Sequence, residues 1–195
     1  MPPSELRADR LILRRWTDAD RAPFAALNAD RVVMRHFPAP LDRAASDALV
    51  DRIEADFDRD GFGLWAIEIA GTGDFIGFTG LSRPSFEAHF TPAVEVGWRL
   101  ARSAWGHGYA TEAAHVALAA GFDGHGLGEI VSMTAVANER SRAVMRRLGM
   151  RRDPADDFDH PRLPDGHPLQ RHVLYRLTAG RWRDLRPAVA PGLIG

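Results

Sequence analysis

The hydrophobic pattern switches period several times between residues 62 and 148, and this switching limits the available folds more than any other feature of the sequence. Residues 62–69 and 75–81 alternate like strands on either side of a Gly-Thr-Gly-Asp turn, which predicts an antiparallel hairpin. Beyond the hairpin, the pattern predicts a strand over 94–100, a helix over 106–122, a strand over 129–136 and a helix over 138–148. This order indicates an α+β fold with three α/β/α-like layers, in which helices flank a mixed sheet.

Elements on both sides of this segment extend the sheet and its helical layers. The sequence predicts a strand over Leu6–Trp16, a helix from the N-cap Thr17 to about Leu27, a helix over Asp42–Asp60 and a final strand over Gln170–Leu177. In the second helix the apolar residues recur every four positions, at Ala45, Leu49, Ile53 and Phe57. The resulting sheet has six to seven strands and is mostly antiparallel. We expect one domain over residues 1–180 and a flexible C-terminal tail over 181–195, where Pro and Gly occur without periodicity.

Composition excludes several classes of protein. The chain has 195 residues, of which 45% are hydrophobic, enough to fill one sizeable core. Its formal net charge of -1 gives no support for a nucleic-acid or membrane partner. It has no cysteine, so a disulfide scaffold, a cysteine zinc site and a cysteine nucleophile are excluded. All 25 Lys+Arg residues are arginine, which is typical of a GC-rich bacterial genome. Because Met1–Arg10 has no apolar segment of the signal-peptide kind, we expect a cytoplasmic protein.

The segment Val94–Ala113 carries the most informative local chemistry. A strand ends near Leu100, and after a short link the residues Trp105–Ala110 (WGHGYA) open a helix. A helix N-terminus has free N–H donors and a partial positive charge, and glycine lets a bound group approach closely, so this turn suits a pyrophosphate. It matches neither a Walker A loop nor Gly-x-Gly-x-x-Gly, because Thr111 stands at the third glycine position. A tight strand-to-helix turn without a ligand is the alternative.

Residues Trp105–Ala110 resemble the coenzyme A-binding motif of the GNAT acetyltransferases, [Arg/Gln]-x-x-Gly-x-[Gly/Ala]. Gly108 and Ala110 stand at the required positions, whereas Trp105 departs from the Arg/Gln consensus. The longer string WGHGYATEA is similar to the RimJ/RimL-type branch of this superfamily. A second segment, Asn138–Met150, resembles the family's Asn-x-x-Ser…Leu-Gly-Phe helix. The resemblance covers most of residues 5–178.

The resemblance implies a GNAT fold and the transfer of an acetyl group from acetyl-CoA to a primary amine by direct attack, without a metal. In this fold two neighbouring parallel strands splay apart, here residues 94–100 and 129–136, and the pantetheine arm lies between them. Backbone N–H groups of Trp98 and Leu100 would bind that arm, and a nearby N–H would polarise the thioester. The other residues expected to bind the cofactor are Trp105, Gly106, His107, Gly108, Tyr109, Ala110, Thr111, Asn138 and Ser141. Asn138 can alternatively be only the N-cap of its helix.

Two side chains are candidates for the catalytic chemistry that the resemblance implies. An amine is mostly protonated at neutral pH, and Glu95 is the candidate base, because it interrupts an apolar series and points to the other side of its strand. A surface glutamate on an ordinary strand is the alternative. Ser141 stands where RimJ/RimL-type relatives have a donor near the departing sulfur. It can also serve only to contact coenzyme A, with Tyr175 or a water as the donor.

The acceptor is the least determined partner. The loop Asp153–Pro168 is acidic and rich in proline, and we hypothesise that Asp156, Asp157 and Asp159 attract a cationic amine there. The spacings of His160, His167 and His172 match no helical pair of metal ligands, so no metal site is predicted.

Several functional alternatives stay open from the sequence. The acceptor can be a protein N-terminus or a small-molecule amine, and the protein a monomer or a homodimer. A non-catalytic acyl-CoA-binding module and a transferase of another acyl group remain as alternatives. A nucleotide- or phosphate-binding protein could use the same glycine turn, and the segment Asn138–Met150 argues against it.

Overall fold

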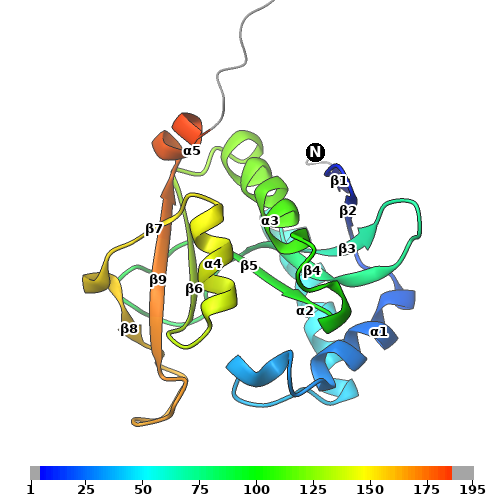
Figure 1. The fold of residues 1–195 in the computed structure, drawn as a ribbon, viewed down its shortest axis with the longest axis horizontal. Helices are drawn as coiled ribbons and strands as arrows, with labels where there is room; N and C mark the ends of the chain where they lie inside the picture. Colours follow the sequence, from blue (N-terminus) through cyan, green and yellow to red (C-terminus); the bar gives the residue numbers. More distant parts are fainter. Residues whose placement is uncertain (1–4, 186–195) are drawn as a thin grey trace, which may run out of the picture.

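Within residues 5–185, which the computed structural model describes, a mixed sheet of nine strands forms the centre of the molecule (Figure 1). The strands are β1 (Glu5–Arg7), β2 (Leu11–Arg14), β3 (Leu64–Ile69), β4 (Phe75–Ser82), β5 (Glu95–Leu100), β6 (Glu129–Ala135), β7 (Arg151–Arg152), β8 (Phe158–Asp159) and β9 (Arg171–Thr178). Their order in the sheet is β1-β2-β3-β4-β5-β6-β9-β7, and β8 pairs with β9. Only β5 and β6 pair in parallel, which confirms the predicted mixed and mostly antiparallel sheet.

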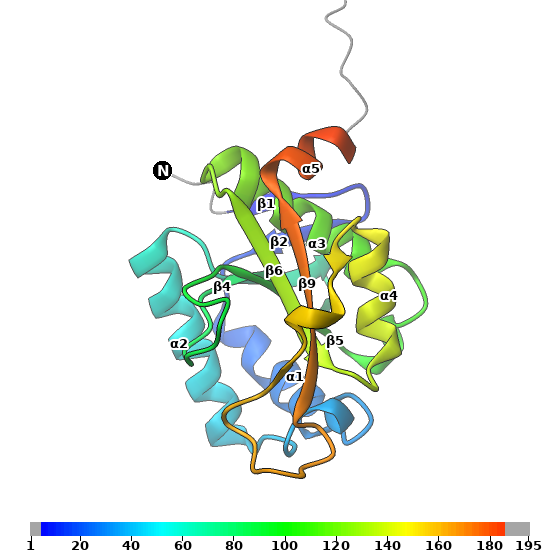
Figure 2. The same ribbon diagram turned by 90° about the vertical axis from the view of Figure 1, so that its left-hand side faces the viewer.

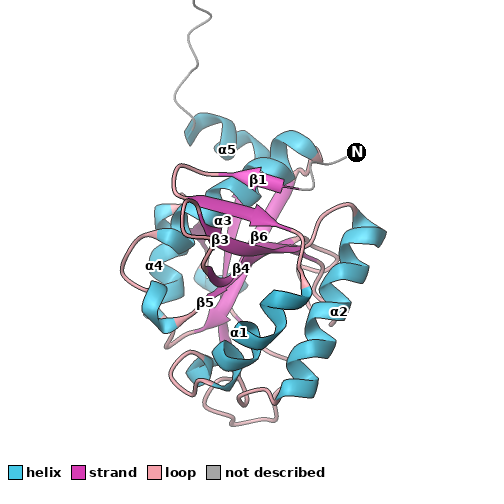
Figure 3. Ribbon diagram, turned by 90° about the vertical axis from the view of Figure 1, so that its right-hand side faces the viewer, coloured by secondary structure: helices cyan, strands magenta, loops and turns pink. Residues whose placement is uncertain are grey.

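Helices cover both faces of the sheet. They are α1 (Asp18–Ala29), α2 (Arg43–Asp60), α3 (Tyr109–Ala119), α4 (Glu139–Arg147) and α5 (Ala179–Leu185), with short turns η1 (Met34–His36), η2 (Arg102–Ala104), η3 (Ala120–Gly124) and η4 (Pro154–Asp156). The strands lie between α2 on one side and α4 on the other (Figure 2, Figure 3). This layering agrees with the predicted α/β/α-like arrangement.

Polar side chains fix where the first two helices begin, and the N-cap Thr17 of the first was predicted from the sequence. Thr17 and Asp20 form a capping box at the start of α1. The Asp42 carboxylate accepts the Ala45 N–H at 2.8 Å at the start of α2. These contacts satisfy backbone donors that have no partner inside the helix.

The buried face of α2 differs from the predicted one. Of the four apolar positions in the predicted repeat, Ala45 is exposed and Leu49 is half-buried. The residues that α2 buries are Ser46, Val50, Ile53 and Phe57. A strict four-residue repeat drifts around a helix of 3.6 residues per turn, whereas spacings of four, three and four keep to one face.

The N-terminal segment is a hairpin rather than the single strand predicted over Leu6–Trp16. β1 and β2 pair antiparallel with Leu6 opposite Leu13, and the Ala8 N–H closes the turn on the Leu11 carbonyl at 2.9 Å. Each of the two strands is too short to show a distinct alternation. This split, together with the two-residue strands β7 and β8, raises the strand count above the predicted six to seven.

β5 and β6 touch at one position and then diverge. They pair only where Glu95 lies opposite Val131, and there the Val131 N–H donates to the Val94 carbonyl at 2.9 Å. Beyond this point β5 stays paired with β4 and β6 stays paired with β9. The predicted splayed parallel pair is therefore present at the centre of the sheet.

The chain beyond Gly180 was predicted to be loose, yet its first residues complete α5. Trp182 is 2% exposed, and its ring stacks on Phe122 with 5.4 Å between the centroids. The Arg181 guanidinium donates to the Gly149 carbonyl at 2.6 Å. The buried indole and the bond from Arg181 fix this short helix, and two such contacts leave no periodic pattern in the sequence. Residues 186–195 of the predicted tail lie outside the described residues.

Candidate active site

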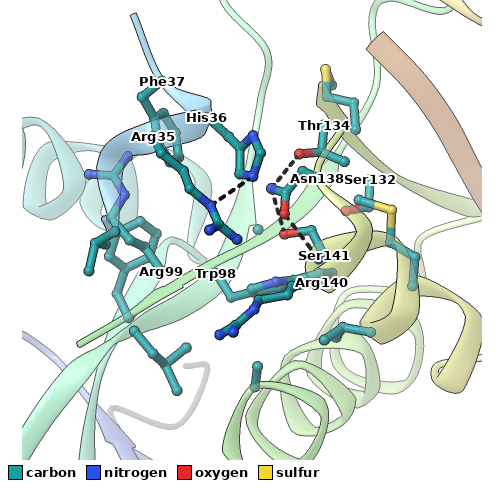
Figure 4. Close-up of a pocket in the computed structure, with 18 of the residues that line it drawn as sticks. Arg35, His36, Phe37, Trp98, Arg99, Ser132, Thr134, Asn138, Arg140 and Ser141 are labelled. Atoms are coloured by element: carbon teal, nitrogen blue, oxygen red, sulfur yellow. Dashed lines mark hydrogen bonds between the residues drawn. The ribbon is translucent and has the colours of Figure 1, made fainter. Parts of the chain in front are cut away.

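One large cavity opens where β5 and β6 diverge, and its volume is about 1140 Å³. Both strands, the N-terminal ends of α3 and α4, the η1 segment and the loop before β9 contribute to its wall. Figure 4 shows two groups of side chains facing each other across this space. We call them the α4 end (Thr134, Asn138, Ser141) and the η1 end (Arg35, His36, Phe37, Arg99).

The glycine turn delivers free backbone donors to this cavity. Gly106 and Gly108 have φ of 85° and 82°, a left-handed conformation that glycine adopts without strain. No side chain caps α3, and in the described part of the chain the N–H groups of residues 106–110 have no intramolecular acceptor. A Cβ at Gly106 would meet nothing within 4 Å. The turn thus presents several donors and the positive end of the α3 dipole, an arrangement that suits a diphosphate.

Contacts from two other elements hold the turn in position. In the first turn of α3, the Glu112 carboxylate accepts from the Arg10 backbone and side chain, each at 2.8 Å. The Trp105 indole N–H donates to the Leu100 carbonyl at 2.9 Å, and the Arg140 guanidinium lies 4.5 Å from the Trp105 ring centre. The departure of Trp105 from the Arg/Gln consensus therefore has a structural role, because this indole ties the turn to the end of β5.

The register of β5 directs two of its amides toward the gap. The Ala101 N–H donates to the Ile76 carbonyl of β4 at 2.8 Å, so every second residue before Ala101 also bonds to β4 in this antiparallel ladder. The N–H groups of Trp98 and Leu100 are out of phase with these bonds and point toward β6, which has already diverged. Both residues line the cavity. Their expected contact with a pantetheine arm stays a prediction.

Asn138 organises the α4 end. Its side-chain oxygen accepts the Ser141 N–H at 3.3 Å, and its amide nitrogen donates to the Thr134 and Ser141 hydroxyls at 2.9 and 3.1 Å. Asn138 is therefore an N-cap, and it also lines the cavity together with Ser141. Because the Ser141 hydroxyl oxygen accepts from Asn138, its own proton remains available for an acceptor in the cavity.

Glu95 lies on the cavity wall at the point where the two strands separate. Burial raises the pKa of its carboxyl to about 7, and a hydrogen bond from the Met133 backbone offsets part of this rise. It is the one carboxylate among the cavity-lining residues of segment 5–185. A half-buried carboxyl that exchanges its proton near neutral pH suits a general base and differs from an exposed surface glutamate.

Two residues singled out from the sequence do not reach the cavity with their side chains. His107 is exposed and stacks on Tyr109 with 5.4 Å between ring centroids, so only its backbone belongs to the glycine turn. Tyr175 is 4% exposed and does not line the cavity. Of the two hydroxyl groups considered as donors to sulfur, Ser141 is the one that faces the open space.

The acidic loop does not present its aspartates to the cavity. The three aspartates of the hypothesis are each paired with an arginine: Asp156 with Arg176, Asp157 with Arg152 and Asp159 with Arg171. The loop instead contributes His160, Arg162 and Leu163 to the wall, and Leu169 directly after it also lines the cavity. The hypothesis that these aspartates attract a cationic amine is therefore wrong, because none of the three lines the cavity, each lies against an arginine, and the loop adds basic and apolar groups to the wall.

Two histidines of this region also face the cavity. The rings of His160 and His172 lie 4.9 Å apart, and burial lowers the pKa of both imidazoles, which are therefore neutral at pH 7. Across residues 5–185, no three His, Cys, Asp or Glu side chains gather as metal ligands would. No helix in the same range combines the length and hydrophobicity that crossing a membrane requires.

The η1 end was not found from the sequence. Residues 34–38 carry neither a motif nor a periodic pattern, and only the fold brings them over β5. One signal could have pointed to Arg99, because it stands four positions after Glu95 and thus shares its face of the strand.

A parallel strand pair opens here beside a helix that begins with an uncapped glycine turn, and this arrangement suits a ligand with a diphosphate and an extended arm. Residues 10–151 match the family described as "Acetyltransferase (GNAT) domain". The chain belongs to this family and is an acyltransferase.

Individual relatives agree with this membership. The chain is 31% identical over 148 residues to the uncharacterized protein YkkB of Bacillus subtilis, covering 75% of this chain and 85% of that protein. It is 33% identical over 128 residues to FsC-acetyl coenzyme A-N(2)-transacetylase of Aspergillus fumigatus, covering 63% of this chain and 52% of that protein. A solved GNAT-family acetyltransferase from Bacillus anthracis has the same fold, with a TM-score of 0.75, 22% identity and coverage of 90% and 99% of the two chains.

Proposed function

We propose that this enzyme moves an acetyl group from acetyl-CoA to a primary amine by direct attack. The observation that carries the proposal is the position of Glu95, a carboxyl with a pKa of about 7, in the same cavity as the free amides of residues 106–110. The chain has no cysteine, which excludes an acyl-enzyme on a thiol and favours direct transfer.

The chain offers a continuous set of groups for coenzyme A. The amides of residues 106–110 would bind the diphosphate, and the Trp98 and Leu100 N–H groups would bind the pantetheine arm. Arg102, Arg140 and Arg147 line the cavity and would add positive charge opposite phosphate oxygens. Acetyl-CoA would supply the activated thioester. The fit rests on donors without partners in this chain, which a polyanionic ligand would satisfy.

Two side chains would handle protons. Glu95 would accept the proton that the ammonium form of the acceptor must lose before its nitrogen becomes a nucleophile. Ser141, whose hydroxyl proton is free, would donate toward the departing sulfur. Asn138 would orient Ser141 through its bonds to the backbone and to the hydroxyl.

The finer assignment follows the sequence motif. The string WGHGYATEA favours the RimJ/RimL-type branch, and the acceptor would be a protein N-terminus or a small-molecule amine in the cytoplasm. The name of the Aspergillus relative, an N(2)-transacetylase, supports nitrogen as the accepting atom.

Release of coenzyme A from acetyl-CoA tests this proposal on a panel of small amines and peptide N-termini. The protein contributes no thiol, so a thiol reagent reads only released coenzyme A. We expect amine-dependent release and an acetylated product of the matching mass. Tight binding of coenzyme A without turnover on any amine would instead indicate a binding module, and faster turnover of succinyl-CoA would indicate another acyl donor.

A further inference from the structure

The positive charge of the cavity is not balanced by carboxylates of the chain. Six arginines line the cavity, and in the range 5–185 none of them forms a salt bridge: Arg35, Arg99, Arg102, Arg140, Arg147 and Arg162. Most of the arginines elsewhere in this range are paired with Asp or Glu. Three of the six lie near the glycine turn and α4, where coenzyme A phosphates are expected. The charge at the η1 end needs a different partner.

Arg99 is the most buried of the arginines at the η1 end. One of its terminal nitrogens donates to the Asn28 side-chain oxygen at 2.6 Å, and its guanidinium lies 4.1 Å from the ring centre of Phe37. Asn28 is fully buried and donates in turn to the Ser46 hydroxyl at 2.9 Å, so α1 and α2 hold the guanidinium in place. Burial lowers the pKa of Arg99 to about 10, which leaves it charged at pH 7. Its Nε–H is buried and has no acceptor in residues 5–185.

The η1 end contains a second buried donor, on His36. The Arg35 Nε–H donates to His36 Nε2 at 3.1 Å, so the neutral imidazole carries its proton on Nδ1. Burial and the charge of Arg35 lower the pKa of His36, which favours this neutral form. His36 Nδ1 is buried and has no partner among the described residues. Buried donors without acceptors cost free energy, so the pair calls for a group that only accepts hydrogen bonds.

The strand between Glu95 and Arg99 forms an open floor. Both side chains share one face of β5 with Gly97 between them, and a Cβ at Gly97 would meet nothing within 4 Å. The Cα atoms of Glu95 and Arg99 are about 13 Å apart along the strand. A base at one end of this floor and an unpaired cation at the other match a molecule that carries an amine and an anion.

We propose that the acceptor carries a carboxylate in addition to its amine, and that Arg35, His36 and Arg99 bind this carboxylate. The assignment deepens the proposed transfer to an amine and rests on it for the role of Glu95. Arginine matches the planar, two-oxygen geometry of a carboxylate, and carboxylate oxygens would accept hydrogen bonds from the guanidinium and imidazole groups that line this end of the cavity. The amine would then lie toward Glu95, where its proton can leave.

Binding of reaction products tests the carboxylate site without requiring turnover. The probes are acetylamino carboxylic acids of increasing chain length and their carboxamides, titrated by calorimetry into the protein with coenzyme A present. At the best length we expect the acid to bind roughly tenfold or more tighter than its carboxamide, because charge-assisted bonds are lost in the amide. Equal affinities, or no binding of any acid at millimolar concentration, would overturn the proposal.

Matched variants locate the effect. Arg35→Gln changes an exposed side chain, so its folding is not in question, and it should remove the preference for the acid while leaving coenzyme A affinity unaltered. Arg52→Gln, an exposed arginine outside the cavity, should change neither. Arg99→Gln should act like Arg35→Gln, after circular dichroism shows that it folds. If Arg35→Gln weakened coenzyme A instead of the acids, the η1 end would belong to coenzyme A and the proposal would fail.

Turnover on paired acceptors separates this inference from the proposed function. Amino acids should show KM values roughly tenfold or more below those of their amino amides, and Arg35→Gln should raise only the former. If acids bind selectively but no amine is acetylated, the carboxylate site stands and the transfer proposal fails. If amines are acetylated with no difference between acids and amides, the transfer stands and the carboxylate site fails.

Discussion

Glu95 illustrates how its surroundings change the chemistry of one side chain. A glutamate on a solvated strand is ionised at neutral pH and is a weak base, whereas burial at the strand divergence raises the pKa of this carboxyl to about 7. Because this carboxyl also lies beside the cavity, its raised pKa makes it a suitable proton acceptor there.

The first prediction concerns the pH dependence of activity. Below pH 7 Glu95 is protonated and cannot accept a proton, so kcat/KM of the native enzyme should rise with pH through about 7. Glu95→Gln should lose this dependence and lower the rate roughly 10²- to 10⁴-fold, as read from a pH–rate series. Glu87→Gln, an exposed glutamate outside the cavity, is the control and should keep the native profile. An unchanged rate and profile in Glu95→Gln would remove Glu95 from this role.

The same carboxyl predicts a change in stability of known sign. Its folded pKa of about 7 lies above the ordinary value of 4.5, so folding favours the protonated form, and stability falls as the pH rises between these values. Glutamine cannot ionise, so Glu95→Gln should gain on the order of 1–3 kcal/mol in free energy of unfolding at pH 8 relative to pH 4. Denaturant melts at the two pH values measure this gain. An equal effect at both would show that the native carboxyl is solvated.

At the scale of elements, the glycine turn before α3 is the part whose backbone shape the site depends on most. Gly108 has φ 82°, and alanine in that conformation costs about 1–2 kcal/mol. We expect Gly108→Ala to shift the amides and to weaken coenzyme A binding about tenfold or more, measured by calorimetry. Gly73→Ala in the β3–β4 turn, at φ 76°, should carry a similar strain without affecting coenzyme A. Equal losses of affinity in both variants would contradict a specific role for the turn.

Elements with a strong local signal were predicted correctly from the sequence. Thr17 and Asp42 begin their helices, Asn138 caps α4, and Gly149 follows its end with φ 77°. The hairpin turn also agrees, and in these cases the deciding interactions lie within a few residues of one another. The splayed strands agree as well, but they were expected from the family resemblance and not from a local signal.

Elements fixed by distant contacts were missed. β1 pairs with β2 and β2 with β3, and Arg10 in the turn between β1 and β2 contacts Glu112 of α3. α5 depends on a buried indole, that of Trp182, and on the bond from Arg181 to Gly149. The η1 end is similar, because Arg99 becomes an oriented, unpaired cation only when Asn28 arrives from α1. Such properties belong to the folded chain and leave no pattern in a window of sequence.

At the scale of the whole molecule, positive and negative side chains are nearly equal in number but are distributed unevenly. The formal net charge is -1, yet within residues 5–185 the cavity wall contains six arginines and a single carboxylate. A concave wall of one sign attracts an oppositely charged ligand over distances longer than a contact.

Association of coenzyme A should therefore depend on ionic strength. We expect its on-rate to fall on the order of tenfold between about 0.01 and 0.3 M salt, because the Debye length shortens from about 30 to 6 Å. Stopped-flow quenching of tryptophan fluorescence can follow binding, since Trp98 and Trp105 line the cavity. Pantetheine lacks the phosphates and should bind at a rate nearly independent of salt. The same salt response for both compounds would argue against steering by the arginines.

Because β5 and β6 pair at one position, the sheet consists of two halves, β1 to β5 and β6 to β9, joined at that position. Amides of β5 and β6 that face the gap between the two halves can exchange with deuterium without any unfolding. Amides that pair β3 with β4 exchange only after the strands open. A ligand bound between β5 and β6 would take the place of a missing strand and connect the two halves of the sheet. Binding of the ligand would then slow amide exchange in β5 and in β6 at the same time.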